Sequence, residues 1–211
     1  MEQPINYLLS NNTILIQPEK ISIFNDYSSK LKNNNGYENI NSIRWATKLW
    51  ELRKIVDGLI QIHKVNIAHR DFHSGNILLN RISLKFIRSI KISVLGRSNS
   101  ATESGDNNEN YGIIPYMAPE IFQRQKYDKA SDIYSLGMVM WELMTGRRPF
   151  WDRSHDTDLI IDICDGLRPP IVTNAPEGYI ELMEEYWHSN PEKRPSATDI
   201  HDKLNKKNRE R

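Results

Sequence analysis

A polar loop between two apolar runs carries the residues of this chain that are best suited to chemistry. Asp71 and Asn76 lie five residues apart, between an apolar run that ends at Ala68 and another that begins at Ile77. An aspartate carboxylate can take the proton of a reacting hydroxyl. An amide carbonyl is one of the hard oxygen ligands that magnesium prefers. The pair therefore has the chemistry of a general base beside a metal ligand.

The elements that hold this loop follow from the apolar pattern on either side of it. Apolar residues at spacings of three and four predict a helix over about residues 42–63, which feeds the loop directly. The apolar runs 77–79 and 90–94 follow the loop and predict a small antiparallel pair of strands. Upstream of the helix, the runs 14–16 and 21–24 could also form strands. The candidate residues would therefore lie between the end of a helix and the start of a hairpin.

The second half of the chain is predicted to be helical. Residues 132–145 are apolar on nearly every side, which predicts a central buried helix with Ser131 as its N-cap. Shorter helices are predicted over about 156–165 and 176–188. A capping box that starts at Ser196 predicts a final helix.

Composition narrows the class of protein. The 211 residues, 38% of them hydrophobic, suffice for one domain, or one and a fraction, with its own core. A formal net charge of +1 gives no argument for nucleic acid or an anionic membrane as partner. No apolar run approaches the roughly 18 residues that a membrane helix needs. The single cysteine, Cys164, excludes an internal disulfide and is expected to be a small buried residue. We expect an intracellular, cytoplasmic protein.

Four motifs occur in order along the chain. They are His69-Arg70-Asp71 with Asn76, Ala118-Pro119-Glu120, the run from Ser131 to Gly137, and the run from Asn190 to Pro195. With these motifs at compatible spacings, the chain from about Ser42 to Leu204 resembles the protein kinase superfamily, in particular its tyrosine-kinase-like group. The resemblance implies an α+β, mainly α fold. That fold is a kinase-like C-terminal lobe, a helical bundle around a buried central helix with a small β-hairpin by the catalytic loop.

The resemblance also implies roles for the residues of the loop. Asp71 would be the base that orients a substrate hydroxyl, and Asn76 would hold a magnesium ion. Arg70 would bind a phosphorylated residue of the segment that follows, because a guanidinium suits a phosphate bidentately. Leu78 would form the floor under the adenine, and His69 belongs to the same catalytic motif. The implied cofactors are ATP and Mg²⁺.

Three further residues are implied to support the fold. Asp132 would accept backbone N–H groups of the catalytic loop and so pin it to the central helix. Glu120 and Arg194 would form a buried ion pair. Breaking one half of such a pair typically costs about 3–5 kcal/mol.

The chain departs from the family pattern where the nucleotide phosphates would lie. Val94 precedes Leu95-Gly96, where the family carries the magnesium-binding aspartate of D-F-G, and valine cannot coordinate a cation. The sequence contains no G-x-G-x-x-G and no lysine in a V-A-I-K context. Residues 1–40 are therefore expected to be an irregular lead-in and not a complete N-terminal lobe. Residues 41–205 would be the kinase-like lobe and 206–211 a basic tail.

Other departures lie in and near the loop. His73 stands two residues after Asp71, where serine/threonine kinases usually carry lysine, and Ile113 stands where they usually carry threonine. Phe72 replaces a leucine, which is a mild change. The spacing of His69 and His73 raises zinc as an alternative, but a zinc helix needs both histidines on one helical face and a third ligand. A loop is predicted here, which argues against zinc.

Taken together, the motifs and departures favour a kinase-like domain with impaired phosphoryl transfer that acts as a pseudokinase-like binding or signalling module. One alternative is an active kinase that transfers the γ-phosphate of ATP to protein Ser, Thr or Tyr and is completed by a missing lobe or a partner. A second is a non-functional fragment. We expect a protein partner or substrate, and a partner or a dimer that covers the exposed lobe face. No nucleic acid or membrane is expected.

Overall fold

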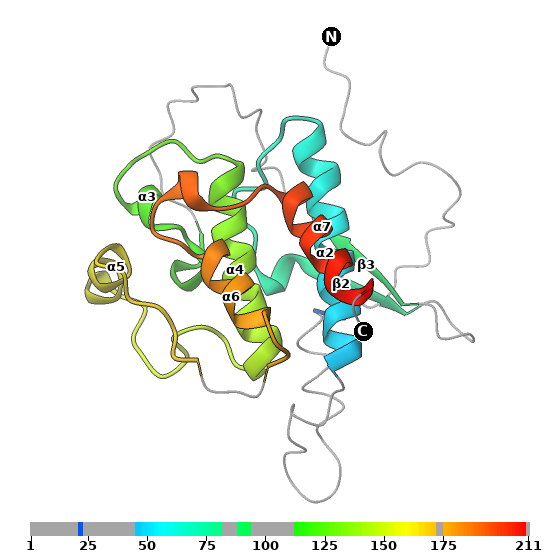
Figure 1. Ribbon diagram of the computed structural model, residues 1–211. Coiled ribbons are helices and arrows are strands. Elements are labelled where there is room, and N and C mark those ends of the chain that lie inside the picture. The colour runs from blue at the N-terminus through cyan, green and yellow to red at the C-terminus, as the bar shows by residue number, and fades with distance from the viewer. Residues whose placement is uncertain (1–20, 23–44, 82–87, 94–111, 172–174, 210–211) are drawn as a thin grey trace, which may run out of the picture.

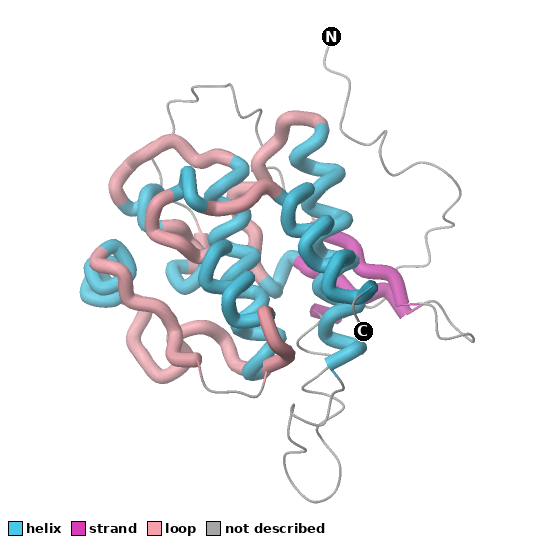
Figure 2. The backbone as a smooth tube through the Cα atoms, in the orientation of Figure 1, coloured by secondary structure: helices cyan, strands magenta, loops and turns pink. Residues whose placement is uncertain are grey.

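The structure is a computed structural model that describes residues 21–22, 45–81, 88–93, 112–171 and 175–209 (Figure 1). Helices make up most of the described chain. A small sheet lies at one side of the molecule, next to helix α2 (Trp45–Lys64). Figure 2 shows the same separation of helices from strands. The expected mainly α architecture with a small β element is confirmed.

Helix α2 is the helix predicted from the spacing of apolar residues ahead of the loop. Its inner face, with Leu52, Ile55 and Leu59 at 0% exposure, packs into the core. Its neighbours are the last helix, α7 (Ala197–Arg209), and strand β3 (Arg88–Ile92). Gly58 lies under the Ile92 side chain, whose Cδ1 would be 2.8 Å from a Cβ added to the glycine. The small residue therefore admits a side chain of the sheet.

The sheet has three antiparallel strands in the order β1-β2-β3. Strand β2 (Ile77–Arg81) pairs with β3 in the register Ile77↔Ile92, as the hairpin prediction expects. Strand β1 (Ile21–Ser22) pairs with the other edge of β2, with Ile21 opposite Leu79. The run 21–24, noted above as a possible strand, thus supplies an edge strand. The run 14–16 lies outside the described residues.

The central helix is α4 (Lys129–Thr145), and it is buried from Ser131 to Met144. The prediction of Ser131 as its N-cap is wrong, because the cap is Asp128, three residues earlier. The Asp128 carboxylate accepts a hydrogen bond of 3.1 Å from the backbone N–H of Ser131. The helix ends at Gly146, whose φ of 72° lies in the left-handed region that glycine adopts readily.

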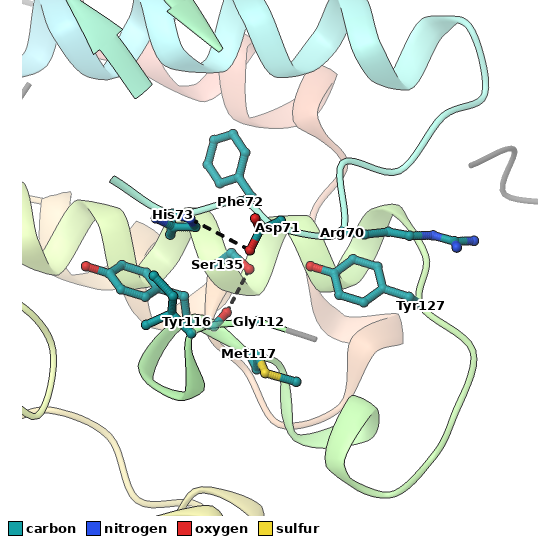
Figure 3. A pocket seen from close by; sticks show the side chains of 10 residues that line it. Arg70, Asp71, Phe72, His73, Gly112, Tyr116, Met117, Tyr127 and Ser135 are labelled. Atoms are coloured by element: carbon teal, nitrogen blue, oxygen red, sulfur yellow. Dashed lines mark hydrogen bonds and ion pairs between the residues drawn. The ribbon is translucent and has the colours of Figure 1, made fainter. Parts of the chain in front are cut away.

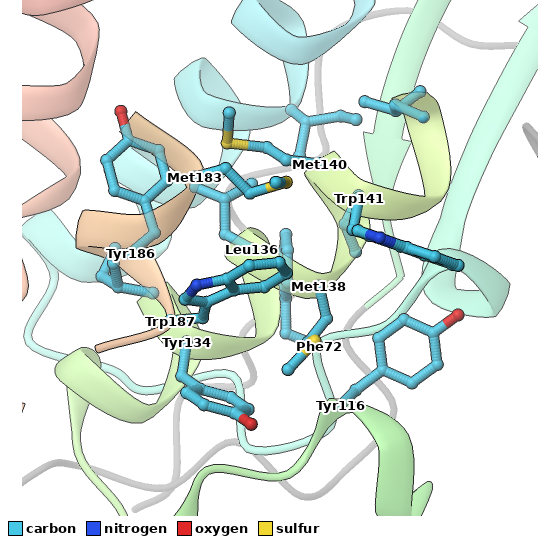
Figure 4. Close-up of a cluster of buried hydrophobic side chains, with 14 of the residues drawn as sticks. Phe72, Tyr116, Tyr134, Leu136, Met138, Met140, Trp141, Met183, Tyr186 and Trp187 are labelled. Carbon is cyan, nitrogen blue, oxygen red and sulfur yellow. The ribbon is translucent and has the colours of Figure 1, made fainter. Parts of the chain in front are cut away.

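Large side chains of α4 and of the segments packed around it form the core (Figure 4). Helix α6 (Tyr179–Tyr186) comes so close that a Cβ on Gly137 would lie 3.1 Å from the backbone nitrogen of Trp187. Two of the aromatic residues here have their polar ends paired, since Trp141 donates to the Pro170 carbonyl and Tyr179 to the Met140 carbonyl at 2.9 Å each. The buried hydroxyls of Tyr134 and Tyr186 have no hydrogen-bond partner among the described residues.

The remaining elements are short. They are the 3₁₀ turns η3 (Ser74–Asn76), η4 (Ile114–Tyr116) and η5 (Pro191–Lys193), and the helices α3 (Pro119–Phe122) and α5 (Thr157–Cys164). Helices α5 and α6 fall inside their predicted ranges. Helix α7 begins directly after Ser196, and the predicted capping box between Ser196 and Asp199 is formed. The helix continues to Arg209, so most of the basic tail expected from residue 206 is helical. None of the described helices combines the length and the apolar character needed to cross a bilayer.

Cys164 differs from its prediction. It ends α5 and is half-buried, with its Sγ 3.8 Å from the Pro119 carbonyl oxygen, whereas a fully buried residue was expected. Burial, followed by the nearby Asp165 charge, raises the pKa of its thiol. The position at the last turn of a short helix explains the partial exposure.

Candidate active site

The loop between α2 and β2 is held by a single carboxylate of the central helix. Asp132 has no exposed surface. Its Oδ2 accepts from the backbone N–H of His69 at 2.7 Å, and its Oδ1 accepts from that of Arg70 at 3.1 Å. The structure thus places Asp132 where the resemblance implies. Hydrogen bonds to a charged acceptor contribute about 1.5–3 kcal/mol each, so the loop is firmly tied.

A second histidine, at the end of α2, shares the same carboxylate. The Nε2 of His63 lies 2.9 Å from Asp132 Oδ2, and the ring is largely buried. Sequence reasoning missed this residue. Its position at the end of the helix that feeds the loop was the available signal.

His69 is a buried support of the loop. It is 2% exposed, its Nε2 lies 2.8 Å from the Ser93 carbonyl oxygen, and its Nδ1 accepts from the backbone N–H of Asp71 at 3.3 Å. The ring also meets Phe72 edge-on, with 5.5 Å between centroids. His69 therefore ties the loop to β3. His73, the other histidine considered for zinc, also lies beside Asp71, but at its carboxylate, whereas His69 accepts from its backbone N–H.

Asp71 and Asn76 lie together, as their spacing indicated. The Asn76 Nδ2 donates to the Asp71 carbonyl at 2.8 Å and to its carboxylate Oδ2 at 3.1 Å. The Asp71 side chain is 17% exposed, so the carboxylate remains within reach of a ligand. The amide nitrogen of Asn76 is used on Asp71, and no described residue donates a hydrogen bond to its carbonyl oxygen, which is the atom that the resemblance implies as a metal ligand.

The backbone of Arg70 itself has an uncommon conformation. Its φ is 65°, in the left-handed region that residues other than glycine rarely occupy. Its Nε is buried and has no hydrogen-bond partner within the described part of the chain. Figure 3 shows the side chain extending away from the Asp71 carboxylate, near Tyr127. The segment that would carry its expected phosphorylated partner lies outside the described residues.

A shallow hollow opens beside Asp71 (Figure 3). Its walls come from the catalytic loop, the central helix and the segment around η4. The lining residues are Arg70, Asp71, Phe72, His73, Gly112, Ile113, Tyr116, Met117, Tyr127 and Ser135. The space is about 10 Å³, near the least that holds one ordered water molecule. Ile113, where a threonine was expected, is 41% exposed at its rim.

A buried polar network adjoins the hollow through Tyr116, one of its lining residues. The Tyr116 hydroxyl donates to Glu142 Oε2 on the central helix and lies 3.2 Å from the Ser74 hydroxyl. Burial raises the pKa of Glu142 to about 7, and burial also raises the pKa of Tyr116. The network joins catalytic loop, η4 and α4. Sequence reasoning missed it, although an acidic residue within the apolar run 132–145 was a signal.

The second tie between distant segments is an ion pair. Arg194 donates to both carboxylate oxygens of Glu120, at 2.6 and 2.8 Å, with both residues buried. The same guanidinium donates to the carbonyls of His188 at 2.7 Å and Ala130 at 3.0 Å. Ser131 donates its hydroxyl to Glu120 at 3.0 Å. This pair, implied by the resemblance, is fully surrounded by hydrogen bonds, as a buried pair requires.

Of the two residues that the resemblance places near the nucleotide, the structure describes Leu78 but not Val94. Leu78 lies in the middle strand, between Ser22 of β1 and Lys91 of β3, and is half-buried. Val94, in the position of the metal-binding aspartate, lies outside the described residues. Apart from Val94, the predicted residues are all described, and those of the loop converge on Asp132 and Asp71.

Comparison with known proteins also finds protein kinases. Residues 6–204 match the family model of the protein kinase domain, a match that starts well before the motifs recognised from Ser42 onward. A probable serine/threonine-protein kinase of Dictyostelium discoideum is 32% identical over 157 residues, 67% of this chain and 10% of that protein. The serine/threonine-protein kinase STY17 of Arabidopsis thaliana is 29% identical over 178 residues, 82% of this chain and 30% of that protein.

A third relative comes from an animal. Mitogen-activated protein kinase kinase kinase 13-A of Xenopus laevis is 31% identical over 146 residues, 69% of this chain and 15% of that protein. The chain therefore spans less than a third of the length of each of these relatives.

Proposed function

Because this chain belongs to the protein kinase superfamily, we propose that it is a kinase-type domain that binds ATP with magnesium but transfers phosphate only weakly. Its role would then be that of a binding or signalling module with a protein partner. The family generally uses ATP and Mg²⁺. The observation that carries the proposal is the pairing of Asp71 with Asn76 on a loop fixed by Asp132.

The oxygen atoms at this site fit magnesium. A carboxylate on Asp71 and an amide oxygen on Asn76 are hard ligands of the kind that Mg²⁺ takes, usually together with substrate phosphates. Asn76 would hold the ion, which would neutralise charge on the ATP phosphates when bound. The Asp71 carboxylate would accept the hydrogen bond of an incoming hydroxyl and orient it. Asp132 would keep both side chains in place before substrate arrives, since it fixes the loop backbone.

Val94 is the reason to propose weak transfer. A valine side chain offers no oxygen to a cation, so the ion would lose a carboxylate ligand. Charge stabilisation by a metal ion supplies several kcal/mol in such reactions. Each 1.36 kcal/mol corresponds to about a factor of ten in rate. Loss of the ligand should therefore reduce the rate by several powers of ten.

The test compares the natural chain with Val94→Asp. Isothermal titration calorimetry should detect ATP binding in the presence of magnesium. Labelled ATP should give little incorporation with the natural chain and at least about tenfold more with Val94→Asp. The double variant Asp71→Asn/Val94→Asp is the matched control and should lose that gain. Absence of ATP binding by both chains would refute the nucleotide part of the proposal.

The assembled loop favours a second candidate function, an active protein kinase. Its distinguishing result is incorporation by the natural chain at a rate that Val94→Asp does not raise and that Asp71→Asn abolishes. That result would refute impaired transfer while leaving the role of Asp71 intact.

A further inference from the structure

The ring of His73 has a defined tautomer. The backbone N–H of Gly75 donates to its Nδ1 at 3.0 Å, which caps the η3 turn. A backbone amide can only donate, so Nδ1 must present a lone pair. A neutral imidazole carries one proton, which in this arrangement must be on Nε2. His73 therefore faces the site with an N–H donor.

That donor points at the Asp71 carboxylate (Figure 3). The His73 Nε2 lies 3.7 Å from Asp71 Oδ1, and the side chains are 15% and 17% exposed. It also lies 3.1 Å from the Asn76 Nδ2. Two N–H groups cannot bond each other, and Asn76 already uses its hydrogens on the Asp71 carbonyl and Oδ2. The two carboxylate oxygens of Asp71 thus have different neighbours. Oδ2 accepts a hydrogen bond from Asn76, and Oδ1 faces the Nε2 of His73.

The distance of 3.7 Å is longer than a direct hydrogen bond. Moving Nε2 about 0.5 Å closer would bring the two atoms within N–H···O hydrogen-bond distance. His73 would then donate to Oδ1 while Asn76 donates to Oδ2.

Gly75 is the second part of this arrangement. A Cβ added at Gly75 would lie 2.7 Å from Cε1 and 2.9 Å from Nδ1 of the His73 ring. Real Cβ atoms do not come this close to other atoms, so any side chain at position 75 would displace the ring. The glycine thus leaves room for the ring and supplies the N–H that sets its tautomer.

We propose that His73 is a positioning residue for Asp71, acting as a neutral Nε2–H donor whose tautomer is set by Gly75. This role rests on the proposed function, because it positions the carboxylate that would orient the hydroxyl. The lysine usual in serine/threonine kinases would bring a permanent charge at this place, whereas His73 brings a neutral donor.

The first experiment measures the tautomer in the full chain without nucleotide. Nitrogen-15 NMR of the histidine rings above neutral pH, with His73 assigned by its loss in His73→Asn, should show the proton on Nε2. Gly75→Ala should abolish this preference because the ring is displaced. Gly112→Ala, in the same hollow but against the flexible Met117 side chain, should leave it unchanged. A proton on Nδ1, or no response to Gly75→Ala, would overturn the proposal.

The second experiment measures the effect on Asp71. An asparagine at position 73 can still accept from Gly75 and donate to Asp71, whereas a leucine can do neither. The carboxylate carbon-13 signal of Asp71 should therefore move in His73→Leu and stay near its natural position in His73→Asn. In the Val94→Asp background, His73→Leu should lower kcat about ten- to a hundredfold with KM unchanged. Equal signals in both variants would overturn the proposal.

Both NMR measurements use the free protein. Failure of ATP binding would therefore refute the proposed function without altering these spectra, and the two failures are distinguishable.

Discussion

Two polar clusters of this domain differ in how completely their groups are enclosed. The Glu120–Arg194 pair has side-chain exposures of 5% and 0%, with contacts of 2.6 and 2.8 Å. The Asp71–His73 pair has exposures of 17% and 15% and an approach of 3.7 Å. The groups of the first pair make their hydrogen bonds to each other and to other atoms of the protein. The second is partly exposed at a hollow. This contrast fits the proposed function, in which the ion pair supports the fold and the loop binds a ligand.

The largest effect is expected from breaking the enclosed pair. Arg194→Ala would leave the Glu120 carboxylate buried without its cation and should lower the free energy of unfolding by about 3–5 kcal/mol in urea denaturation. The double variant Glu120→Gln/Arg194→Met should recover part of this loss. A loss below about 1 kcal/mol, the value of an exposed pair, would contradict the comparison.

The second largest effect on stability is expected from Asp132, whose carboxylate joins the loop to the central helix. Asp132→Ala removes the acceptor for His69 and Arg70 and should cost about 3 kcal/mol of unfolding free energy, the lower limit for two bonds to a charged acceptor. Hydrogen exchange should show faster exchange at those two amides. The control is Asp128→Ala, which loses a helix cap worth about 1 kcal/mol and should leave the loop amides protected. Equal exchange in both variants would mean that Asp132 does not fix the loop.

A pH effect is expected from Glu142. Burial raises the pKa of its carboxyl in the folded chain to about 7, from an ordinary value of 4.5. The folded state then holds a proton that the unfolded state releases, so the stabilisation is complete below the ordinary value and is lost as the pH rises to about 7. The difference in stability between the natural chain and Glu142→Gln should fall by on the order of 1 kcal/mol per pH unit across that interval. Urea denaturation at several pH values measures it, and a flat difference would refute it.

The smallest effect on stability is expected at the open pair. Asp71→Asn keeps the shape of a partly exposed side chain and should change the free energy of unfolding by no more than about 0.5 kcal/mol. The same change should abolish whatever phosphoryl transfer Val94→Asp confers. If Asp71→Asn destabilised the protein as much as Arg194→Ala does, the distinction between the two clusters would fail.

The sequence predicted the parts of the structure that depend on local pattern. The apolar spacing over 42–63 predicted α2, and the runs 77–79 and 90–94 predicted the hairpin. These two features follow from periodicity and from residues close in sequence. The role of Asp132, which accepts from the loop across 63 residues of chain, was implied only by the resemblance to kinases.

Features that depend on tertiary contact were missed or misplaced. Ser131 and Asp128 are both good capping residues, and the choice between them involves Glu120, which accepts the Ser131 hydroxyl. The network of Glu142 and Tyr116 joins segments whose proximity no local pattern encodes. The same holds for the fit of an isoleucine side chain over Gly58.

The pairing of β1 with β2 has a consequence for the order of folding. Strands β2 and β3 are neighbours along the chain, whereas Ile21 meets Leu79 across a long intervening segment. Closing a long loop costs more entropy than closing a hairpin, and such contacts tend to form late. We expect β1 to add to a hairpin that has already formed. Changes in β1 would then chiefly accelerate unfolding, because a contact made after the transition state contributes to the unfolding barrier alone.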